Sequence, residues 1–183
     1  MTRTHGPRVL FIYGLEGHPN GSKVRMLRAQ GLEVFAPDMK MSLWDLKREN
    51  GMVRQALRDT EARLAVLGSL GAVGGGVVRG SGWWVGAGFA GAGLWAATRL
   101  QHVWERALDK SLRACVEIQR RAIQEIKPDI VVGSSWGGAV SAALLAQGAW
   151  SGPTILLAPA IQRVEERSGR RDMSALTATL QKV

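Results

Sequence analysis

Ser135 stands at the centre of a Gly-x-Ser-x-Gly motif, a pattern that can hold a serine hydroxyl ready to attack a carbonyl carbon. Residues 129–138 read Asp-Ile-Val-Val-Gly-Ser-Ser-Trp-Gly-Gly, so a β-branched apolar run leads directly into the motif. An amphipathic, Ala-rich stretch over residues 139–147 follows it. A strand, a tight turn and a helix in this order would expose the hydroxyl at the edge of a sheet. We therefore predict a nucleophile elbow at Ser135, with a purely structural Gly-rich turn as the alternative.

The residues next to Ser135 have the types that such a turn requires. Gly133 and Gly137, two positions before and after it, would keep side chains out of the space where strand and helix backbones nearly touch. The backbone N–H of Trp136 would open the helix and point toward a developing oxyanion. The motif and its neighbours therefore favour acyl-transfer chemistry.

Three other apolar segments are expected to form the strands that position this turn. They are residues 8–13, 33–36 and 154–158, each followed directly by Gly or Pro. After the first of them, a helix is predicted with Ser22 as its N-cap and Gly31 as its end. Four apolar strands separated by helices, with Gly-rich loops at their carboxyl ends, predict an α/β fold with an open parallel sheet and flanking helices.

The chain resembles the α/β-hydrolase superfamily, in particular its small bacterial esterase-like members. The resemblance covers residues 8–40 and 101–162. The segments that carry it are Gly-Leu-Glu-Gly-His-Pro at 14–19, Ala-Pro-Asp at 36–38, the run at 128–138 and Leu-Leu-Ala-Pro-Ala at 156–160.

The resemblance implies a serine hydrolase that acts on a carboxylic ester or thioester, and hence a small-molecule ester-type substrate. Ser135 would be the nucleophile, and the backbone N–H groups of Trp136 and Leu15 would stabilise the oxyanion. The family usually carries His-Gly at the end of the first of these strands, where this chain has Tyr13 and Gly14.

The catalytic acid and histidine of the family have no counterpart after Ser135. In the family they follow the serine along the chain, whereas the histidines of this chain all precede it; they are His5, His18 and His102. The acids after Ser135 read as charges on a solvated helix surface; they are Glu165, Glu166 and Asp172. We expect a domain that is C-terminally incomplete relative to the family: a truncated hydrolase, an inactive relative, or an enzyme with an unusual base.

His18 is the local candidate for such a base, because its loop is expected to lie near the elbow. A solvent-facing loop histidine before Pro19 is the alternative. A serine without a base is a weak nucleophile at neutral pH. Three functions therefore stay open: a hydrolase, a catalytically inactive binding protein that uses the same crevice, and a membrane-associated scaffold.

Composition sets further limits. A chain of 183 residues predicts a single domain over 1–183. Its one cysteine, Cys115, permits no internal disulfide, which suits a cytoplasmic protein. The formal net charge of +9 is spread over helix surfaces and mixed with acids, without a nucleic-acid-binding motif, so no nucleic-acid partner is expected. No metal-ligand spacing, dinucleotide fingerprint or phosphate loop is present, so neither a metal nor another cofactor is expected.

Residues 41–100 are predicted to form an insertion, and its centre is the second unusual feature of the chain. Between 64 and 98 the only charged residue is Arg79, and the segment is rich in Gly and Ala with three Trp in its second half. Small residues allow close helix contact in a membrane, and arginines flank the segment on both sides. We predict an apolar helical hairpin over 64–98 with its turn at 80–82, which would associate with membrane lipid and hold the rest of the domain on the cytoplasmic side.

The length of the segment limits this prediction. A helix over 64–78 would reach only about 22 Å at a rise of about 1.5 Å per residue, against a hydrocarbon core about 30 Å thick. A shallow or tilted hairpin therefore fits better than two full spans. The alternatives are a soluble lid over Ser135, an oligomer contact or a disordered loop.

A polar helical stretch over 43–63 is expected before the segment. After it, an amphipathic helix over 101–126 is expected to pack on the sheet through Leu108, Leu112, Val116 and Ile123.

Overall fold

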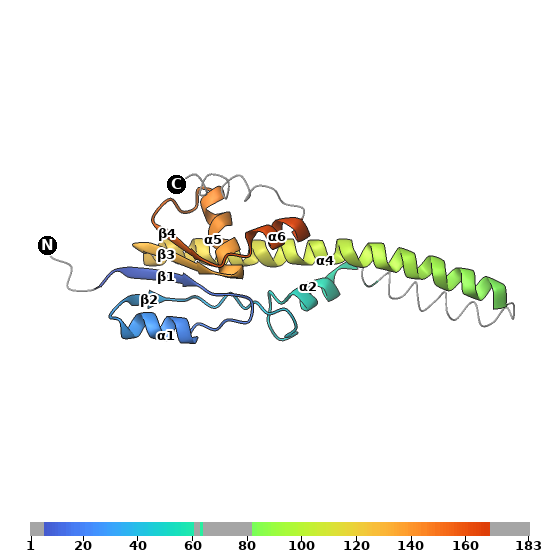
Figure 1. Cartoon of the computed structure of the whole chain (residues 1–183), viewed down its shortest axis with the longest axis horizontal. Coiled ribbons are helices and arrows are strands. Elements are labelled where there is room, and N and C mark those ends of the chain that lie inside the picture. The colour runs from blue at the N-terminus through green and yellow to red at the C-terminus, as the bar shows by residue number, and fades with distance from the viewer. Residues whose placement is uncertain (1–5, 61–62, 64–81, 169–183) are drawn as a thin grey trace.

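The computed structural model describes residues 6–60, 63 and 82–168, of which 82–98 are described by their backbone alone. In this part of the chain, four strands form one parallel sheet in the order β2-β1-β3-β4 (Figure 1). The strands are β1 (Arg8–Ile12), β2 (Glu33–Phe35), β3 (Ile130–Ser134) and β4 (Thr154–Leu157). The predicted α/β class with a parallel sheet is confirmed, while its finer assignment to the hydrolase architecture stays a prediction.

The two central strands, β1 and β3, supply much of the core. Leu10, Ile12 and Val131 are fully buried, as expected for strands of a parallel sheet that is covered on both faces. β4 at the edge of the sheet exposes alternate apolar residues, Ile155 and Leu157. The continuous apolar runs of the sequence thus located the central strands correctly.

The strand order places a topological switch point between β1 and β3. From β1 the chain first adds β2 on one side and later β3 on the other, with Ile12 of β1 paired to Gly133 of β3. In open α/β sheets, ligands bind outside the carboxyl ends of the strands at such a point. The loop after β1 begins there at Tyr13, and Ser135 alone joins β3 to α5.

The helices that follow these strands differ in detail from the sequence predictions. α1 (Ser22–Ala29) has the extended residue Gly21 as its N-cap, so the predicted cap at Ser22 is wrong by one residue. Gly31 follows the helix with a φ of 80°, a left-handed conformation typical of a glycine that ends a helix, as predicted. α5 (Trp136–Ala146) is buried as far as Leu144 because it contacts three strands and two further helices. It is therefore a central helix, and the prediction of an amphipathic one is wrong.

Residues 43–51 form a loop, so the predicted helical stretch over 43–63 is wrong for its first part. Helix α2 (Met52–Arg58) begins only after this loop. The Asn50 N–H donates to the Lys40 carbonyl at 3.0 Å and closes the loop on itself. Because the Asn50 N–H is used in this bond, it does not form the hydrogen bond to the residue four positions earlier that the predicted helix would require.

α4 (Gly82–Ile126) is one continuous helix of 45 residues, about 67 Å long at a rise of about 1.5 Å per residue. In Figure 1 its C-terminal part runs beside the sheet, and its N-terminal part extends far beyond it. The predicted second arm of the hairpin and the amphipathic helix over 101–126 are therefore a single element. No proline interrupts residues 82–126, so nothing in this stretch forces the helix to break.

The membrane and lid predictions for 64–98 are tested only in part. The first arm of the predicted hairpin, with residues 64–81, lies outside the described residues. Within the described part of the chain, no helix combines the length and the apolar character that a bilayer span requires. A lid would have to cover Ser135, and the backbone of 82–98 extends away from the sheet instead (Figure 1).

The predicted contact of α4 with the rest of the fold is confirmed. Leu108, Leu112 and Val116 are buried in the core, and Ile123 packs against it. A buried carboxylate also attaches α4 to the end of α2. Asp59 is 7 % exposed and accepts hydrogen bonds from Arg106 Nε (3.0 Å) and Nη2 (3.2 Å). After β4 the chain forms α6 (Ile161–Ser168), which contacts both α4 and α5.

Candidate functional site

Ser135 follows β3 directly and is the N-cap of α5. Its backbone has a φ of 53° and a ψ of −115°, a conformation that an L-residue adopts only under strain. Ser135 is exposed, whereas its neighbours Ser134 and Trp136 are only 5 % and 1 % exposed. The predicted strand, sharp turn and helix are therefore present, and of the two adjacent serines Ser135 is the one at the surface.

Hydrogen bonds on both sides hold the backbone of Ser135 in this conformation. Its N–H donates to the Leu157 carbonyl at the end of β4 (3.0 Å), and its own carbonyl accepts from Gly138 N (2.9 Å) and Ala160 N (3.0 Å). The turn is thus fixed to β4 and to the loop that follows β4. Because backbone strain persists only where the surrounding contacts over-determine it, these bonds explain why the turn does not relax.

Gly133 and Gly137 leave room for backbone contacts that any side chain would prevent. A Cβ atom on Gly133 would lie 2.7 Å from the Gly137 carbonyl oxygen. One on Gly137 would lie 2.6 Å from the Tyr13 carbonyl oxygen and closer still to the carbonyl of Ile12. The glycines therefore permit α5 to approach β1 and β3, as the sequence predicted.

The loop after β1 lies against the same turn. A Cβ atom on Gly14 would lie 3.3 Å from Ser135 Cβ and 3.8 Å from Ser135 Oγ. Gly17 N donates to the Gly14 carbonyl at 3.0 Å, which closes a turn with Leu15 at its first central position. The Leu15 N–H takes no part in that closing bond, and Trp136, as the first residue of α5, has no acceptor within the helix. The function of these two N–H groups as oxyanion donors stays a prediction.

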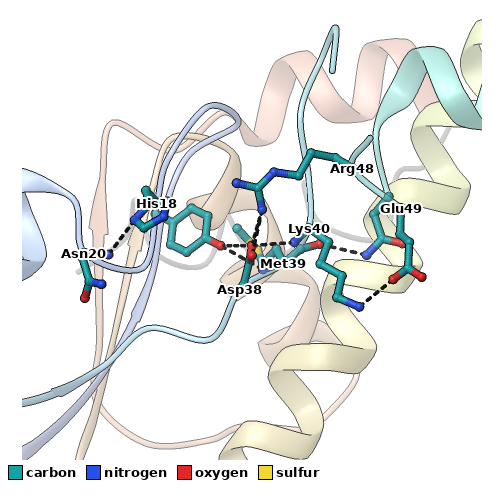
Figure 2. Close-up of polar contacts among 9 residues, drawn as sticks. His18, Asn20, Asp38, Met39, Lys40, Arg48 and Glu49 are labelled. Atoms are coloured by element: carbon teal, nitrogen blue, oxygen red, sulfur yellow. Dashed lines mark hydrogen bonds and ion pairs between the residues drawn. The ribbon is translucent and has the colours of Figure 1, made fainter. Parts of the chain in front are cut away.

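A hydrogen-bonded cluster holds the end of β1 to the chain that follows β2. The Tyr13 hydroxyl donates to Asp38 Oδ1 (2.8 Å) and accepts from Met39 N (2.9 Å). Arg48 Nη1 donates to both oxygens of Asp38, at 3.0 and 2.8 Å. Figure 2 shows Asp38 at the centre of these contacts. Tyr13 occupies the position where the resembled family has histidine, and here its hydroxyl braces the loop that carries Leu15.

The contacts in this cluster keep the phenol of Tyr13 neutral and the carboxylate of Asp38 ionised. Burial, followed by the hydrogen bond to Asp38, raises the pKa of Tyr13 well above its ordinary value, so the phenol stays neutral. Burial opposes ionisation of Asp38, but hydrogen bonds from Lys40 N, from the phenol and from the Arg48 guanidinium outweigh it and lower the pKa of this carboxyl. A lowered pKa stabilises the fold at pH values above the unfolded pKa of the carboxyl. That contribution is lost as the pH falls through the lowered value.

Glu16 provides a second anchor for the same loop. Its Oε1 atom accepts hydrogen bonds from Leu43 N (2.7 Å) and from Ser42 Oγ (3.1 Å). Sequence reasoning did not identify either anchor, although Asp38 belongs to the Ala-Pro-Asp segment that carried the resemblance. No spacing rule connects positions this far apart, so that segment was the one available signal.

His18 is exposed, and its Nδ1 atom accepts a hydrogen bond from Asn20 N at 3.1 Å (Figure 2). In the neutral ring this bond places the proton on Nε2, which is then a donor and not a base. The hydrogen bond therefore weighs against His18 as the base for Ser135. His102 lies on α4 beside Glu105 (3.4 Å), and His5 lies outside the described residues.

The downstream acids give no catalytic partner in the described part of the chain. Glu166 is exposed as predicted, and Asp172 lies outside the described residues. Glu165 was expected to be fully solvated, and this prediction is wrong for one of its two carboxylate oxygens. Its Oε1 is buried without a hydrogen-bond partner among the described residues, because α6 packs against α4 and α5. No side chain described in the structure hydrogen-bonds to the Ser135 hydroxyl.

A cavity of about 180 Å³ lies beside the elbow. Its lining residues come from the carboxyl ends of β1 and β3, the glycine-rich loop and the first residues of α1; they are Phe11, Tyr13, Gly14, Gly17, His18, Gly21, Ser22, Lys23, Val24 and Ser134. Lys23 Nζ donates to the buried Ser134 Oγ at 2.8 Å. Lys23 carries no motif of its own, so its place in this cavity could not be predicted from the sequence.

Other reactive groups are absent from this region or inert. The described residues contain no group of three or more His, Cys, Asp or Glu side chains that could hold a metal ion. Cys115 is buried within the core on α4. Burial raises the pKa of its thiol to about 12, although a contact with Trp136 opposes the shift, so the thiol is a poor nucleophile.

Comparisons with known proteins assign no family to the chain. No protein-family model matches it, and no curated protein and no solved structure shows significant similarity to it. The resemblance to α/β-hydrolases consequently rests on the motifs themselves.

Proposed function

We propose that this chain is a serine hydrolase of the α/β-hydrolase type, which acts on a carboxylic ester or thioester with Ser135 as its nucleophile. The observation that supports this proposal best is the conformation of Ser135. It is strained, held by hydrogen bonds on both sides and exposed at the switch point of a parallel sheet. Strain of this kind clusters at functional sites, where it holds a reacting group in place.

The reaction would proceed through a covalent acyl intermediate. Ser135 Oγ attacks the carbonyl carbon, and the bond from that carbon to the alcohol oxygen or thiol sulfur breaks. The N–H groups of Trp136 and Leu15 would stabilise the negative oxygen of the tetrahedral intermediate. The leaving alcohol or thiol takes up a proton, and water then hydrolyses the acyl-serine to release the acid.

The proton of the Ser135 hydroxyl has no protein acceptor among the described residues, so it would pass to water. A serine without a base reacts slowly at neutral pH. An oxyanion hole and substrate binding alone can still supply about 10³–10⁴-fold acceleration over water. We therefore expect slow, Ser135-dependent turnover by the 183-residue chain.

A second candidate is a binding protein that holds a ligand in the same region without turnover. The observation that favours it is the hydrogen bond from Asn20 N to His18 Nδ1, which occupies the nitrogen that a base would need. The two candidates differ in one measurable property, because a binding protein transfers no acyl group to Ser135.

Hydrolysis of an activated ester such as p-nitrophenyl acetate tests the proposal. The intact chain should release p-nitrophenol slowly, Ser135→Ala should reduce release to the buffer rate, and His18→Ala should retain the rate within about twofold, since His18 is not the base. Ser151→Ala, at an exposed serine outside the cavity lining, is the control and should keep activity. Unchanged release by Ser135→Ala would refute the hydrolase proposal. Rapid release that is lost in His18→Ala would instead identify His18 as the base.

A further inference from the structure

The cavity beside the elbow is placed to receive part of a substrate that Ser135 attacks. Ser135 does not itself line the cavity, but Ser134, which directly precedes it, does. Gly14 is another lining residue, and a Cβ atom added to it would lie 3.3 Å from Ser135 Cβ. Its volume of about 180 Å³ leaves room for several water molecules. An acyl chain of a few carbon atoms with a terminal polar group is of this size.

Three polar side chains of the cavity lining can each donate a hydrogen bond; they are Lys23, Ser134 and His18. The ammonium of Lys23 has three N–H donors and uses one of them on Ser134 Oγ. Ser134 accepts that bond and so keeps its own hydroxyl proton free to donate. His18 accepts at Nδ1, which leaves an N–H at Nε2 on the same lining.

No negative charge on the cavity wall balances the lysine. The lining contains no Asp or Glu, and within the described part of the chain Lys23 forms no ion pair. Phe11 and Val24, which are buried core residues, form the apolar part of the wall, and three glycines and the exposed Ser22 complete the lining. The hydroxyl of Tyr13, which also lines the cavity, is already engaged by Asp38. An apolar chain that ends in a negative group complements this arrangement.

We infer that the cavity binds the terminal carboxylate of an acyl group, with Lys23, Ser134 and His18 as its donors. The preferred substrates are then esters or thioesters of short dicarboxylic acids. This inference rests on the proposed function, because it assigns the acyl group that Ser135 attacks. Lys23 binds the far end of the substrate and takes no part in bond breaking.

The rate test compares two activated esters of equal chain length. Mono-p-nitrophenyl adipate carries the terminal carboxylate, and p-nitrophenyl hexanoate lacks it. The intact chain should prefer the adipate ester in kcat/KM, and Lys23→Gln should lower the adipate-to-hexanoate ratio by about tenfold or more, as expected for a lost hydrogen bond to a charged group. Lys23→Arg should keep most of the ratio. The control Arg25→Gln, which changes an exposed charge on α1 outside the cavity lining, should leave it unchanged.

A lysine that only fastens α1 to β3 would give a different result. In that case Lys23→Gln would slow both esters equally, or reduce stability, and the ratio would stay constant. A constant ratio with measurable Ser135-dependent turnover therefore overturns the assignment of the cavity and leaves the hydrolase proposal intact.

Binding of free adipate to the Ser135→Ala chain, followed by amide chemical shifts, gives a readout without turnover. Adipate should shift the amides around Gly14, Gly17 and Ser134, the neutral adipamide should not, and Lys23→Gln should abolish the shifts. If this binding is seen while Ser135 never reacts, the proposed hydrolysis fails and the carboxylate site stands. If adipate and adipamide behave alike, the inference is wrong.

Discussion

Gly137→Ala is expected to lose about 3 kcal/mol or more of its free energy of unfolding. The added Cβ would lie 2.6 Å from the Tyr13 carbonyl oxygen and nearer still to the Ile12 carbonyl. These are backbone atoms of the central strand and the residue after it, so no side chain can rotate to make room. Overpacking a core costs about 1–3 kcal/mol and occasionally more. A clash with fixed backbone belongs at or above the upper end, against a total stability of about 5–15 kcal/mol for a typical domain.

Urea unfolding followed by circular dichroism measures this effect, with Gly14→Ala as the matched control. A Cβ on Gly14 meets its nearest neighbour, Ser135 Cβ, at 3.3 Å, which a small shift relieves. Gly14→Ala should therefore stay folded and lose less than about 1 kcal/mol. If Gly137→Ala were as stable as Gly14→Ala, the close approach of α5 to β1 would be wrong.

Ser135→Gly is expected to unfold at higher urea concentration than Ser135→Ala. Both variants lack the hydroxyl, so the difference between them reports the backbone. The φ of 53° and ψ of −115° cost a non-glycine residue about 1–3 kcal/mol, and glycine adopts this conformation freely. Glycine loses about 0.4–1 kcal/mol through the larger entropy of its unfolded state. We expect a net advantage of about 1 kcal/mol for Ser135→Gly.

The same pair of substitutions at Ser22 is the control. Ser22 is the first residue of α1, has an ordinary helical backbone and is exposed. Glycine there should be less stable than alanine, as at most helical positions. An equal or lower urea midpoint for Ser135→Gly than for Ser135→Ala would show that the turn at Ser135 carries no strain.

Local sequence patterns were sufficient to predict the parallel sheet and the sharp strand-to-helix turn at Ser135. The runs over 8–13 and 130–134 are buried β1 and β3, and apolar continuity is the direct consequence of covering a parallel sheet on both faces. Gly133 and Gly137 were predictable because a turn this tight excludes side chains at both positions.

The contacts between loops were not predictable in the same way. Tyr13 and Asp38 are 25 residues apart, and their hydrogen bond depends on how the loops after β1 and β2 meet at one edge of the sheet. Lys23 reaches Ser134 across 111 residues of chain. Pairings of this kind follow from the packed fold, and periodicity along one segment does not encode them.

The predicted bounds of the helices were wrong where long-range packing overrides the local helix preference. The charged stretch over 43–51 resembles a solvated helix, but its backbone is used in a closed loop before α2. The Gly-rich backbone over 82–98 was predicted to be a helical arm of a hairpin, separate from the helix over 101–126. It is helical, but it continues into the C-terminal part of α4 without a break, and the other arm lies outside the described residues.

The residue that an active-site probe modifies tests the central claim most directly. The chain is incubated with a fluorophosphonate, digested and analysed by tandem mass spectrometry, with Ser134→Ala and Ser135→Ala treated in parallel. We predict a slowly formed phosphonyl adduct on Ser135 that persists in Ser134→Ala and disappears in Ser135→Ala, because Ser135 alone of the pair is exposed at the turn. An adduct on Ser134, or no adduct on Ser135 of the folded chain after prolonged incubation, would contradict the account.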